Sequence, residues 1–344
     1  MAISLLKQRK IKEPTAESGG QQPARDEVGI VVDDETRITN KDISTGVLVT
    51  TAIFCFSVLI PAVGVLLNLF TPLPVILYRL KLGRKAGAFV LAASSLAAYL
   101  ILSSIGSGGE AVAFIHFGVL GWVAGEVIDR NSSIELAVTL PALAAIGLGV
   151  VLLLVVAMGR ATGPYQLLTA YIDGQVKDTL SLYQSMGVDV PDQNMAQIKT
   201  VMLAVFPGLT IVGLGIVSFL NLMVARRLSA VFKIPFPEFG SLNKWRPPEY
   251  LVWPVIGAGF TLVVPGLGLA VIGLNIFLIA SLIYLLAGLA IVAYFFQQKE
   301  VPRFMRVFGY TLIALTQLVT IAVILIGFVD TWIDFRKPRN QEES

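Results

Sequence analysis

Apolar runs of about 20 residues recur between residues 45 and 332, and short polar or glycine-containing segments separate them. An α-helix needs about 20 apolar residues to cross the roughly 30 Å hydrocarbon layer of a membrane. The pattern therefore predicts an all-α, polytopic membrane-spanning bundle of eight or nine helices. The expected spans are residues 45–60, 62–78, 86–105, 110–127, 133–158, 199–224, 250–265, 268–297 and 306–332.

Composition supports this interpretation, because 55% of the residues are hydrophobic and only 14% are charged. A typical soluble domain has about 25% charged residues, whereas the mean hydropathy of this chain is +0.77. The lipid bilayer is thus an expected partner. The net charge of +3 does not indicate nucleic-acid binding, because lysines and arginines in short loops are typical of membrane orientation signals.

Polar segments flank the apolar region. Residues 1–44 mix charges of both signs with glycine and proline, which predicts a largely disordered amino-terminal tail. Residues 45–337 form the expected transmembrane domain, and residues 338–344 form a short polar carboxyl-terminal tail. The first twelve residues contain no apolar stretch of signal-peptide length, so no cleaved leader is expected.

Basic residues gather in three loops, 79–85, 225–249 and 298–305. An even number of expected spans separates each loop from the next, so all three fall on one face, which the positive-inside rule assigns to the cytoplasm. Loop 160–198 falls on the opposite face. With nine spans, the basic carboxyl-terminal tail would lie outside, against the same rule. Either the last segment does not cross the membrane or the tail is an exception to the rule.

Two segments outside the regular spans have a character of their own. Residues 164–186 repeat apolar positions at helical spacing and predict an amphipathic helix on the membrane surface, serving as a strut or as a substrate lid. Residues 232–254, hereafter the elbow, contain five prolines and six aromatic residues, which excludes a long helix. The aromatic rings fit the lipid headgroup zone, and a docking surface for a soluble partner is the alternative.

Common catalytic and metal-binding motifs are missing from the sequence. A single histidine excludes an HExxH zinc site, and neither a GxxxxGK[ST] phosphate-binding loop nor a GxSxG nucleophile elbow occurs. We therefore expect no metal and no cofactor, and we expect that the chain is not an enzyme.

Polar residues within the apolar runs are the candidate substrate-binding residues, because burying them in hydrocarbon is costly. His116 is the deepest ionisable group of its expected span, which also contains Glu110, and a hydrogen-bonded packing histidine is the alternative. Asn275 follows a Pro-Gly break at residues 265–268, where an interrupted helix or a simple hairpin turn is expected. Tyr284 is the fourth candidate.

Four strings carry a family resemblance. They are TPLPVIL (71–77), WRPPEYLVWP (245–254), YLLAGLA (284–290) and GFVDTWIDFRK (327–337). In this order they resemble the YybS-like family of bacterial predicted multi-pass membrane proteins, over residues 45–337. The resemblance implies a location in the bacterial cytoplasmic membrane and no particular activity. The amino-terminal half is also distantly similar to the substrate-binding membrane subunits of energy-coupling-factor vitamin transporters, which is an analogy of fold alone.

Two functions are compatible with these observations. The first is a transport-related protein that binds a small substrate in a polar cavity among its helices, with any ATPase supplied by a separate chain. The second is a scaffold or regulator that transports nothing and recruits a soluble or membrane protein partner through its polar tail and the elbow.

Overall fold

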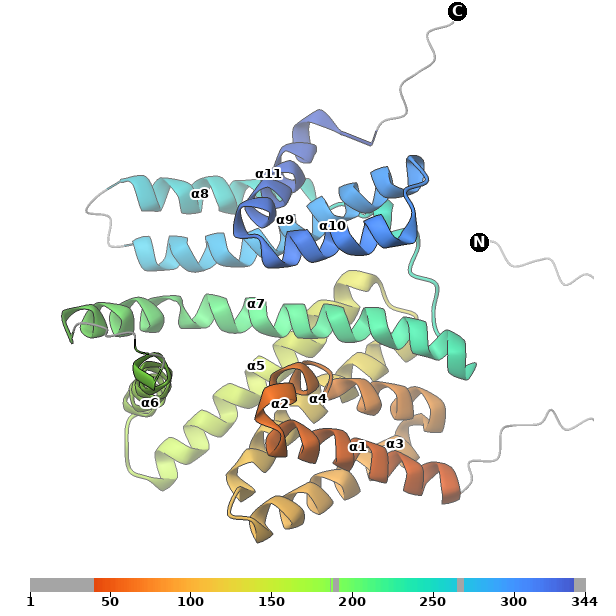
Figure 1. Cartoon of the computed structure of the whole chain (residues 1–344), viewed down its shortest axis with the longest axis vertical. Helices are drawn as coiled ribbons and strands as arrows, with labels where there is room; N and C mark the ends of the chain where they lie inside the picture. The colour runs from red at the N-terminus through yellow and green to blue at the C-terminus, as the bar shows by residue number, and fades with distance from the viewer. Residues whose placement is uncertain (1–39, 186, 188–191, 265–268, 337–344) are drawn as a thin grey trace, which may run out of the picture. The chain divides into compact units, whose positions relative to one another are not determined.

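The computed structural model describes residues 40–185, 187, 192–264 and 269–336, and the regular elements of this part of the chain are helices (Figure 1). Its α-helices are α1 (Asn40–Leu59), α2 (Pro61–Leu69), α3 (Pro72–Ser104), α4 (Ala111–Asp129), α5 (Ile134–Gly159), α6 (Pro164–Ser185), α7 (Asp192–Phe232), α8 (Val252–Val263), α9 (Ala270–Gln298), α10 (Arg303–Leu315) and α11 (Gln317–Ile333). Short 3-10 helices are η1 (Gly108–Glu110), η2 (Leu242–Lys244) and η3 (Glu249–Leu251). The all-α prediction is confirmed.

Several predicted segments fall wholly or largely outside the described residues. Residues 1–39 of the expected amino-terminal tail lie there, while residues 40–44 form the start of α1. The expected tail 338–344 and the expected break at 265–268 also lie outside the described residues.

Prolines and a polar cap mark where several helices begin. Pro72 and Pro164 open α3 and α6, where a missing backbone N–H costs no helical hydrogen bond. The Ser133 hydroxyl caps α5 by accepting a hydrogen bond from the Leu136 amide at 3.4 Å. Helix α6 covers nearly the same residues as the expected amphipathic helix 164–186.

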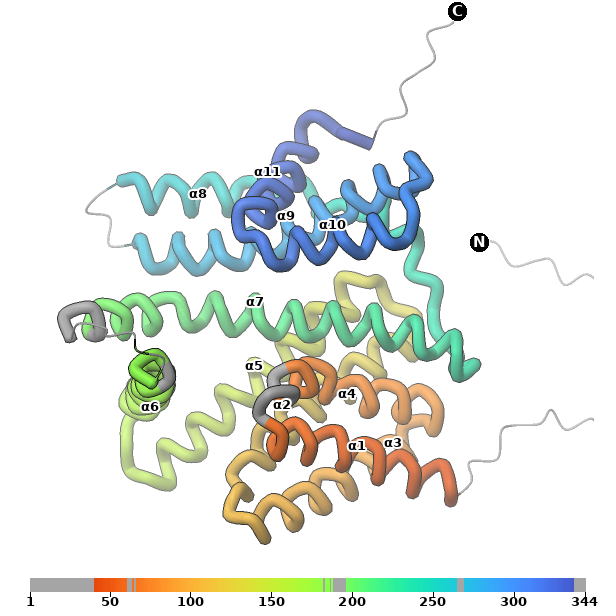
Figure 2. Tube along the Cα trace, viewed as in Figure 1, coloured from red at the N-terminus to blue at the C-terminus, as the bar shows by residue number. Residues whose placement is uncertain are grey.

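Helix α7, which is 41 residues long, lies between two groups of helices (Figures 1 and 2). On one side, Leu214 and Val217 of α7 pack in a buried cluster with Leu120 of α4 and with alanines of α5. On the other side, the Asn275 side chain of α9 hydrogen-bonds to the backbone of α7. Helices α1–α5 and helices α8–α11 are therefore both packed on α7.

Helix α3 reverses direction at Gly83. The φ of Gly83 is 75°, in the left-handed region that glycine adopts without steric cost. A Cβ placed on Gly87 would lie 2.9 Å from the Cα of Arg79, although residues eight apart in a straight helix are about 12 Å apart. Residues 72–82 and 84–104 are therefore two helical segments that fold back on each other.

The residues before this reversal run back along α1. The ring of Tyr78 packs on Gly46 near the start of α1. The Ser57 hydroxyl, near the end of α1, donates a hydrogen bond to Asn68 at 2.9 Å. Residues 61–82 are consequently antiparallel to α1, as expected for a second segment after the break near residue 61.

The number of spanning helices is lower than expected. Six described helices are long and apolar enough to cross a membrane, or seven if α10 and α11 together make one span. This count of candidate spans is lower than the expected eight or nine. Two expected spans share the single stretch Leu66–Ser104, which contains the Gly83 reversal. The expected span 250–265 contains only the 12-residue α8, because prolines in the elbow keep the preceding residues out of the helix.

The last expected span, 306–332, consists of α10 and α11, which are bent by 100° at Thr316. Helix α10 starts shortly after α9 ends. Beyond α11, Arg336 hydrogen-bonds to the backbone of Asn243 in the elbow, and Asn243 in turn donates to Gln297 at the end of α9 at 2.6 Å. The start of α10 and the end of α11 thus lie at the same end of α9. This favours a re-entrant pair, which enters and leaves the bundle on one side. The last segment then does not cross, and the conflict with the positive-inside rule disappears.

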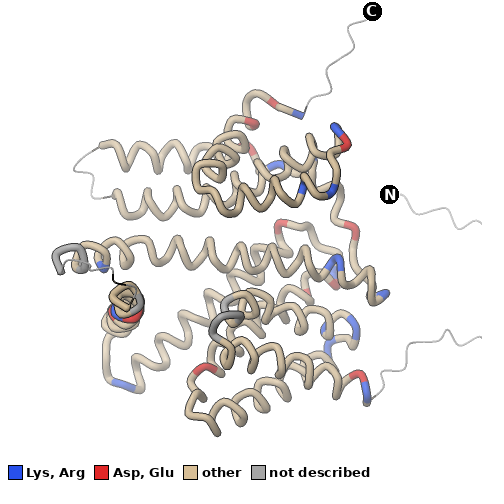
Figure 3. The backbone as a smooth tube through the Cα atoms, viewed as in Figure 1, with Lys and Arg blue, Asp and Glu red and all other residues tan. Residues whose placement is uncertain are grey.

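Charged side chains gather mostly at the end of the bundle where the elbow lies (Figure 3). There Arg79 of α3 reaches Glu126 near the end of α4, and Trp245 of the elbow donates to Glu135 at the start of α5. We call this the basic end. It brings together the three basic loops that the sequence places on one face.

Candidate functional site

The elbow links α7 to α8 mostly without helical structure. Its backbone is extended at Trp245 (ψ 138°) and at Pro248 (ψ 137°). Pro247 and Pro248 lack amide hydrogens and disfavour helical geometry in the residues before them. The carbonyl groups of such a segment have few partners within it, so other parts of the chain must supply hydrogen-bond donors.

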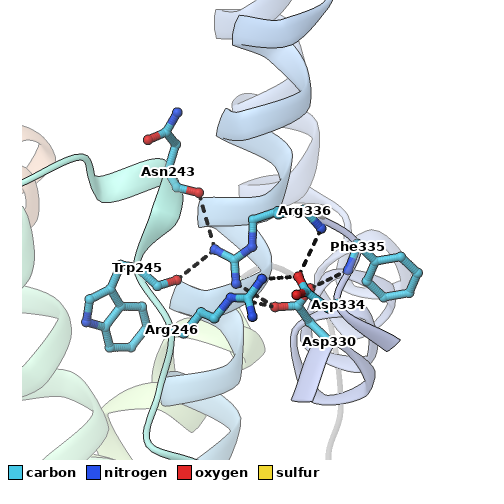
Figure 4. Close-up of polar contacts among 7 residues, drawn as sticks. All are labelled: Asn243, Trp245, Arg246, Asp330, Asp334, Phe335 and Arg336. Atoms are coloured by element: carbon cyan, nitrogen blue, oxygen red, sulfur yellow. Dashed lines mark hydrogen bonds and ion pairs between the residues drawn. The ribbon is translucent and has the colours of Figure 1, made fainter. Parts of the chain in front are cut away.

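Arg336, which follows α11, supplies those donors (Figure 4). Its Nη1 donates to the carbonyl of Trp245 at 2.8 Å and to that of Asn243 at 3.2 Å. Its Nη2 donates to Oδ2 of Asp330 in α11 at 2.5 Å, and the two side chains are only 3% and 4% exposed. One guanidinium therefore joins a carboxylate on α11 to the extended backbone of the elbow.

A second arginine, Arg246 of the elbow, pairs with the same end of α11. It donates a hydrogen bond to Asp334, and its Nε lies 3.9 Å from Oδ2 of Asp330. The hydrogen bond to Asp334 raises the pKa of Arg246 above its ordinary value, so the guanidinium stays protonated. In contrast to Arg336, the Arg246 side chain is 44% exposed. We call Asn243, Trp245, Arg246, Asp330, Asp334 and Arg336 the elbow cluster.

Two hydrogen bonds fix the elbow cluster on neighbouring helices. Asn243 donates to Gln297 of α9 at 2.6 Å, and the indole N–H of Trp245 donates to Glu135 of α5 at 2.7 Å. With two arginines and two aspartates, the cluster is balanced in charge. It contains one buried guanidinium, that of Arg336, which holds the elbow backbone, and one half-exposed guanidinium, that of Arg246, which is paired with Asp334.

A second group of charges fastens the Gly83 reversal to the end of α4. Glu126 accepts hydrogen bonds from Arg79 at 2.5 Å, from Arg84 at 2.9 Å and from Arg130 at 2.9 Å. Arg79 is 1% exposed and is the largest of the fully buried side chains in the described chain. Arg79 also donates to Asp129 at 3.0 Å. We call Arg79, Arg84, Glu126, Asp129 and Arg130 the Glu126 cluster.

Asn275, a predicted substrate-binding residue, hydrogen-bonds through its side chain to the backbone of α7 beside Pro207. Its Oδ1 accepts from the Gly208 amide at 2.6 Å, and its Nδ2 donates to the carbonyls of Ala204 at 2.7 Å and Val271 at 2.8 Å. In a regular helix Gly208 would bond to Ala204, and Pro207 lies next to this pair. The amide of Asn275 is therefore engaged with backbone, and substrate binding by this residue stays a prediction.

The other three predicted residues lie in separate places. His116 of α4 is half-buried, and a Cβ on Gly149 of α5 would lie 3.3 Å from its ring. Tyr284 of α9 is buried, with its ring centroid 5.0 Å from that of Phe328 in α11. Glu110 is exposed at the start of α4. No hydrogen bond, ion pair or ring contact between described residues joins any two of the four candidates, so they do not form one site.

Sequence reasoning missed the residues of both clusters. The positive-inside rule treats Arg79 and Arg246 only as loop charges, although Arg79 is buried. Asp330 could have been selected from the sequence, because it is an acidic residue within the last apolar run. Its partners in the elbow are far away in sequence. Even so, the strings 245–254 and 327–337, which carry part of the family resemblance, form the two sides of the elbow cluster.

Apolar helices of spanning length that pack into one bundle define a polytopic α-helical integral membrane protein. A family model described as "Predicted membrane protein (DUF2232)" matches residues 48–331, and the chain belongs to this family. This membership agrees with the resemblance to YybS-like membrane proteins. No curated protein and no solved structure matches the chain, so the analogy with energy-coupling-factor subunits gains no support.

Proposed function

We propose that this protein is a transport-related component of the bacterial cytoplasmic membrane that binds a small anionic substrate at the elbow cluster. The observation that carries the proposal is the half-exposed guanidinium of Arg246, which lies beside the buried Asp330–Arg336 pair where an extended segment meets a re-entrant helix pair. The positive-inside rule assigns the basic end, and with it the site, to the cytoplasmic side.

Interrupted helices support a binding role. In secondary transporters, substrates and ions bind where helices are discontinuous, because the break frees backbone groups that can line a site. Here the elbow precedes the short α8, and α10 and α11 break at Thr316. The interruption at the elbow cluster is the elbow itself, whereas the break at Thr316 lies at the other end of α11.

The buried charges support the same role. Charged side chains inside a membrane bundle are costly and are functional candidates by default. Arg336 and Asp330 are nearly inaccessible, so they are suited to holding the site in shape rather than to binding a ligand. Their geometry fixes the elbow backbone on both sides of Trp245.

Arg246 indicates the class of substrate. Its guanidinium is half-exposed and already bound to a carboxylate, that of Asp334. A planar guanidinium binds carboxylate and phosphate groups with two parallel hydrogen bonds. A small organic anion can therefore replace Asp334 on Arg246 while the Asp330–Arg336 pair stays closed. Binding followed by release requires no covalent chemistry, in line with the expectation that the chain is not an enzyme.

One observation favours the alternative role as a scaffold. Tyr250 and Trp253, at the end of the elbow, are 68% and 72% exposed. Such rings settle in the headgroup zone of a membrane, and exposed aromatic residues also anchor protein partners. In that case the elbow cluster would shape a docking surface rather than a substrate site.

A thermal-stability screen of the purified full-length protein tests the proposal. Succinate, citrate, glutamate and inorganic phosphate would be compared with uncharged nucleosides and with sodium and potassium chloride at equal ionic strength. The variants would be Arg246→Ala, Arg246→Lys and, as a matched control, Arg227→Ala, which removes an exposed arginine near the end of α7.

We expect at least one anion to raise the melting temperature of the wild type and of Arg227→Ala, and to lose this effect in Arg246→Ala. Saturation of one site at 100 times its Kd stabilises a protein by about 2.7 kcal/mol, which such a screen detects. Arg246→Lys should bind weakly, because lysine lacks the two-pronged geometry. Stabilisation by none of the anions at millimolar concentration, or equal loss in Arg227→Ala, contradicts the proposal and favours the scaffold.

A further inference from the structure

A long groove runs along the outside of the bundle between α1 and the second half of α3. Its volume is about 730 Å³, and it extends from Asn40 at the start of α1 to Cys55 and Ile101. The walls are mainly aliphatic and aromatic side chains, among them Val47, Leu48, Ala52, Phe89, Ala93 and Ala97.

The groove has the length of one lipid chain. From Asn40 to Cys55 the axis of α1 advances by about 22 Å, somewhat more than one leaflet, which is about half of the 30 Å hydrocarbon layer. Leu48 and Phe89 are 69% and 60% exposed, so the groove opens outward to the lipid and not into the bundle.

Three lysines lie near the Asn40 end of the groove, which is at the basic end and which we call its mouth. Lys85 is exposed and lies one helical turn before Phe89, on the same face of α3. Lys81 bonds to Asp42 of α1 at 2.7 Å, and exposed Lys41 stands next to Asp42. Three lysines against one aspartate leave the mouth positively charged.

We propose that this groove binds one anionic phospholipid, with its phosphate at Lys81 and Lys85 and one acyl chain along α1 and α3. Ordinary boundary lipid covers every apolar helix face in a membrane. This site differs because an apolar groove and exposed lysines near one of its ends occur together. The lipid would brace the α1–α3 packing close to the Gly83 reversal, independently of any substrate at the elbow cluster.

The test is native mass spectrometry of the full-length protein, released from nanodiscs that contain equal amounts of phosphatidylglycerol and phosphatidylcholine. Lys85→Glu would reverse the charge at the mouth, and Lys299→Glu is the matched reversal of an exposed lysine elsewhere at the basic end. Ala93→Phe would fill the groove. Ala92→Phe makes the same change at an exposed neighbour that does not line it.

We expect the wild type, Lys299→Glu and Ala92→Phe to retain one phosphatidylglycerol in preference to phosphatidylcholine. Lys85→Glu should lower this preference about 25-fold, because it changes the charge by two units and each unit near an anionic surface contributes roughly fivefold. Ala93→Phe should abolish retention of the lipid.

Four outcomes overturn the proposal. They are equal retention of the two lipids by the wild type, equal loss in the two lysine variants, and retention unchanged by Ala93→Phe. The fourth is a dimer that survives removal of lipid and disappears in Ala93→Phe, which would place a second copy of the chain in the groove. If Ala93→Phe does not fold, the Lys85→Glu and Lys299→Glu comparison still decides.

Discussion

Replacing Asp330 by asparagine removes one charge from the buried pair and leaves the guanidinium of Arg336 in place. Both side chains are almost completely buried, and their atoms are 2.5 Å apart. Removing one partner of a buried ion pair costs about 3–5 kcal/mol, because the other charge stays desolvated without compensation. At 2–4 °C per kcal/mol, this corresponds to a fall in melting temperature on the order of 10 °C.

The double variant Asp330→Asn/Arg336→Met separates charge from hydrogen bonding. Removing both charges abolishes the uncompensated charge, so the double variant should be less destabilised than the sum of the single variants. It still loses the donors to the carbonyls of Asn243 and Trp245, at about 1–3 kcal/mol for each group left unpaired. We expect a coupling energy of about 2 kcal/mol between the two positions.

Two measurements check these values on protein in detergent. Intrinsic-fluorescence melting gives the stability of each variant. Limited trypsin digestion reports whether the elbow is released, since cleavage after Lys244 requires a loosened segment. Asp178→Asn, the same change at an exposed aspartate of α6, is the control. A melting temperature of Asp330→Asn within 2 °C of this control, with no faster cleavage, would refute the reasoning that the pair holds the elbow.

Three further substitutions test other parts of the fold. Arg79→Met should destabilise the protein by about 3 kcal/mol, because it leaves Glu126 partly unpaired, whereas Arg84→Met, at a 60% exposed side chain, should have little effect in the same melting assay. Gly83→Ala should cost on the order of 1 kcal/mol, because alanine is strained at φ 75°. Asn275→Ala should cost about 1–2 kcal/mol, since membrane hydrogen bonds between helices are individually modest, and hydrogen exchange near Pro207 should rise.

Each of these has an outcome that contradicts it. Equal effects of the two arginine substitutions would mean that burial of Arg79 does not matter. A Gly83→Ala variant as stable as the wild type would mean that the positive φ of Gly83 does not strain alanine. Unchanged hydrogen exchange in Asn275→Ala would show that α7 needs no support at its proline.

Sequence reasoning predicted what depends on local patterns. Apolar runs of the length of the bilayer identified the all-α membrane class, and the proline-rich composition of the elbow predicted the absence of a long helix there. The spacing of apolar residues after Pro164 predicted a helix close to the observed α6.

What the sequence did not reveal depends on partners that are distant along the chain. Nothing near Thr316 distinguishes a 100° bend from a continuous span, because residues 310–326 contain neither proline nor glycine. The role of Arg336 depends on carbonyls of the elbow, which lies more than 80 residues earlier. The four candidate polar residues were selected by depth in their own spans, and depth does not indicate which helices are neighbours.

The burial of Arg79 has a consequence for biogenesis. Arg79 lies near the end of segment 61–82, where an arginine opposes membrane insertion less than the roughly 2.5–3.5 kcal/mol that it costs at a helix centre. The acidic partner of Arg79, Glu126, is synthesised 47 residues later, at the end of α4. The buried environment of Arg79 is therefore expected to form only after α4 has emerged from the ribosome, so that packing of segment 61–82 does not follow the order of synthesis.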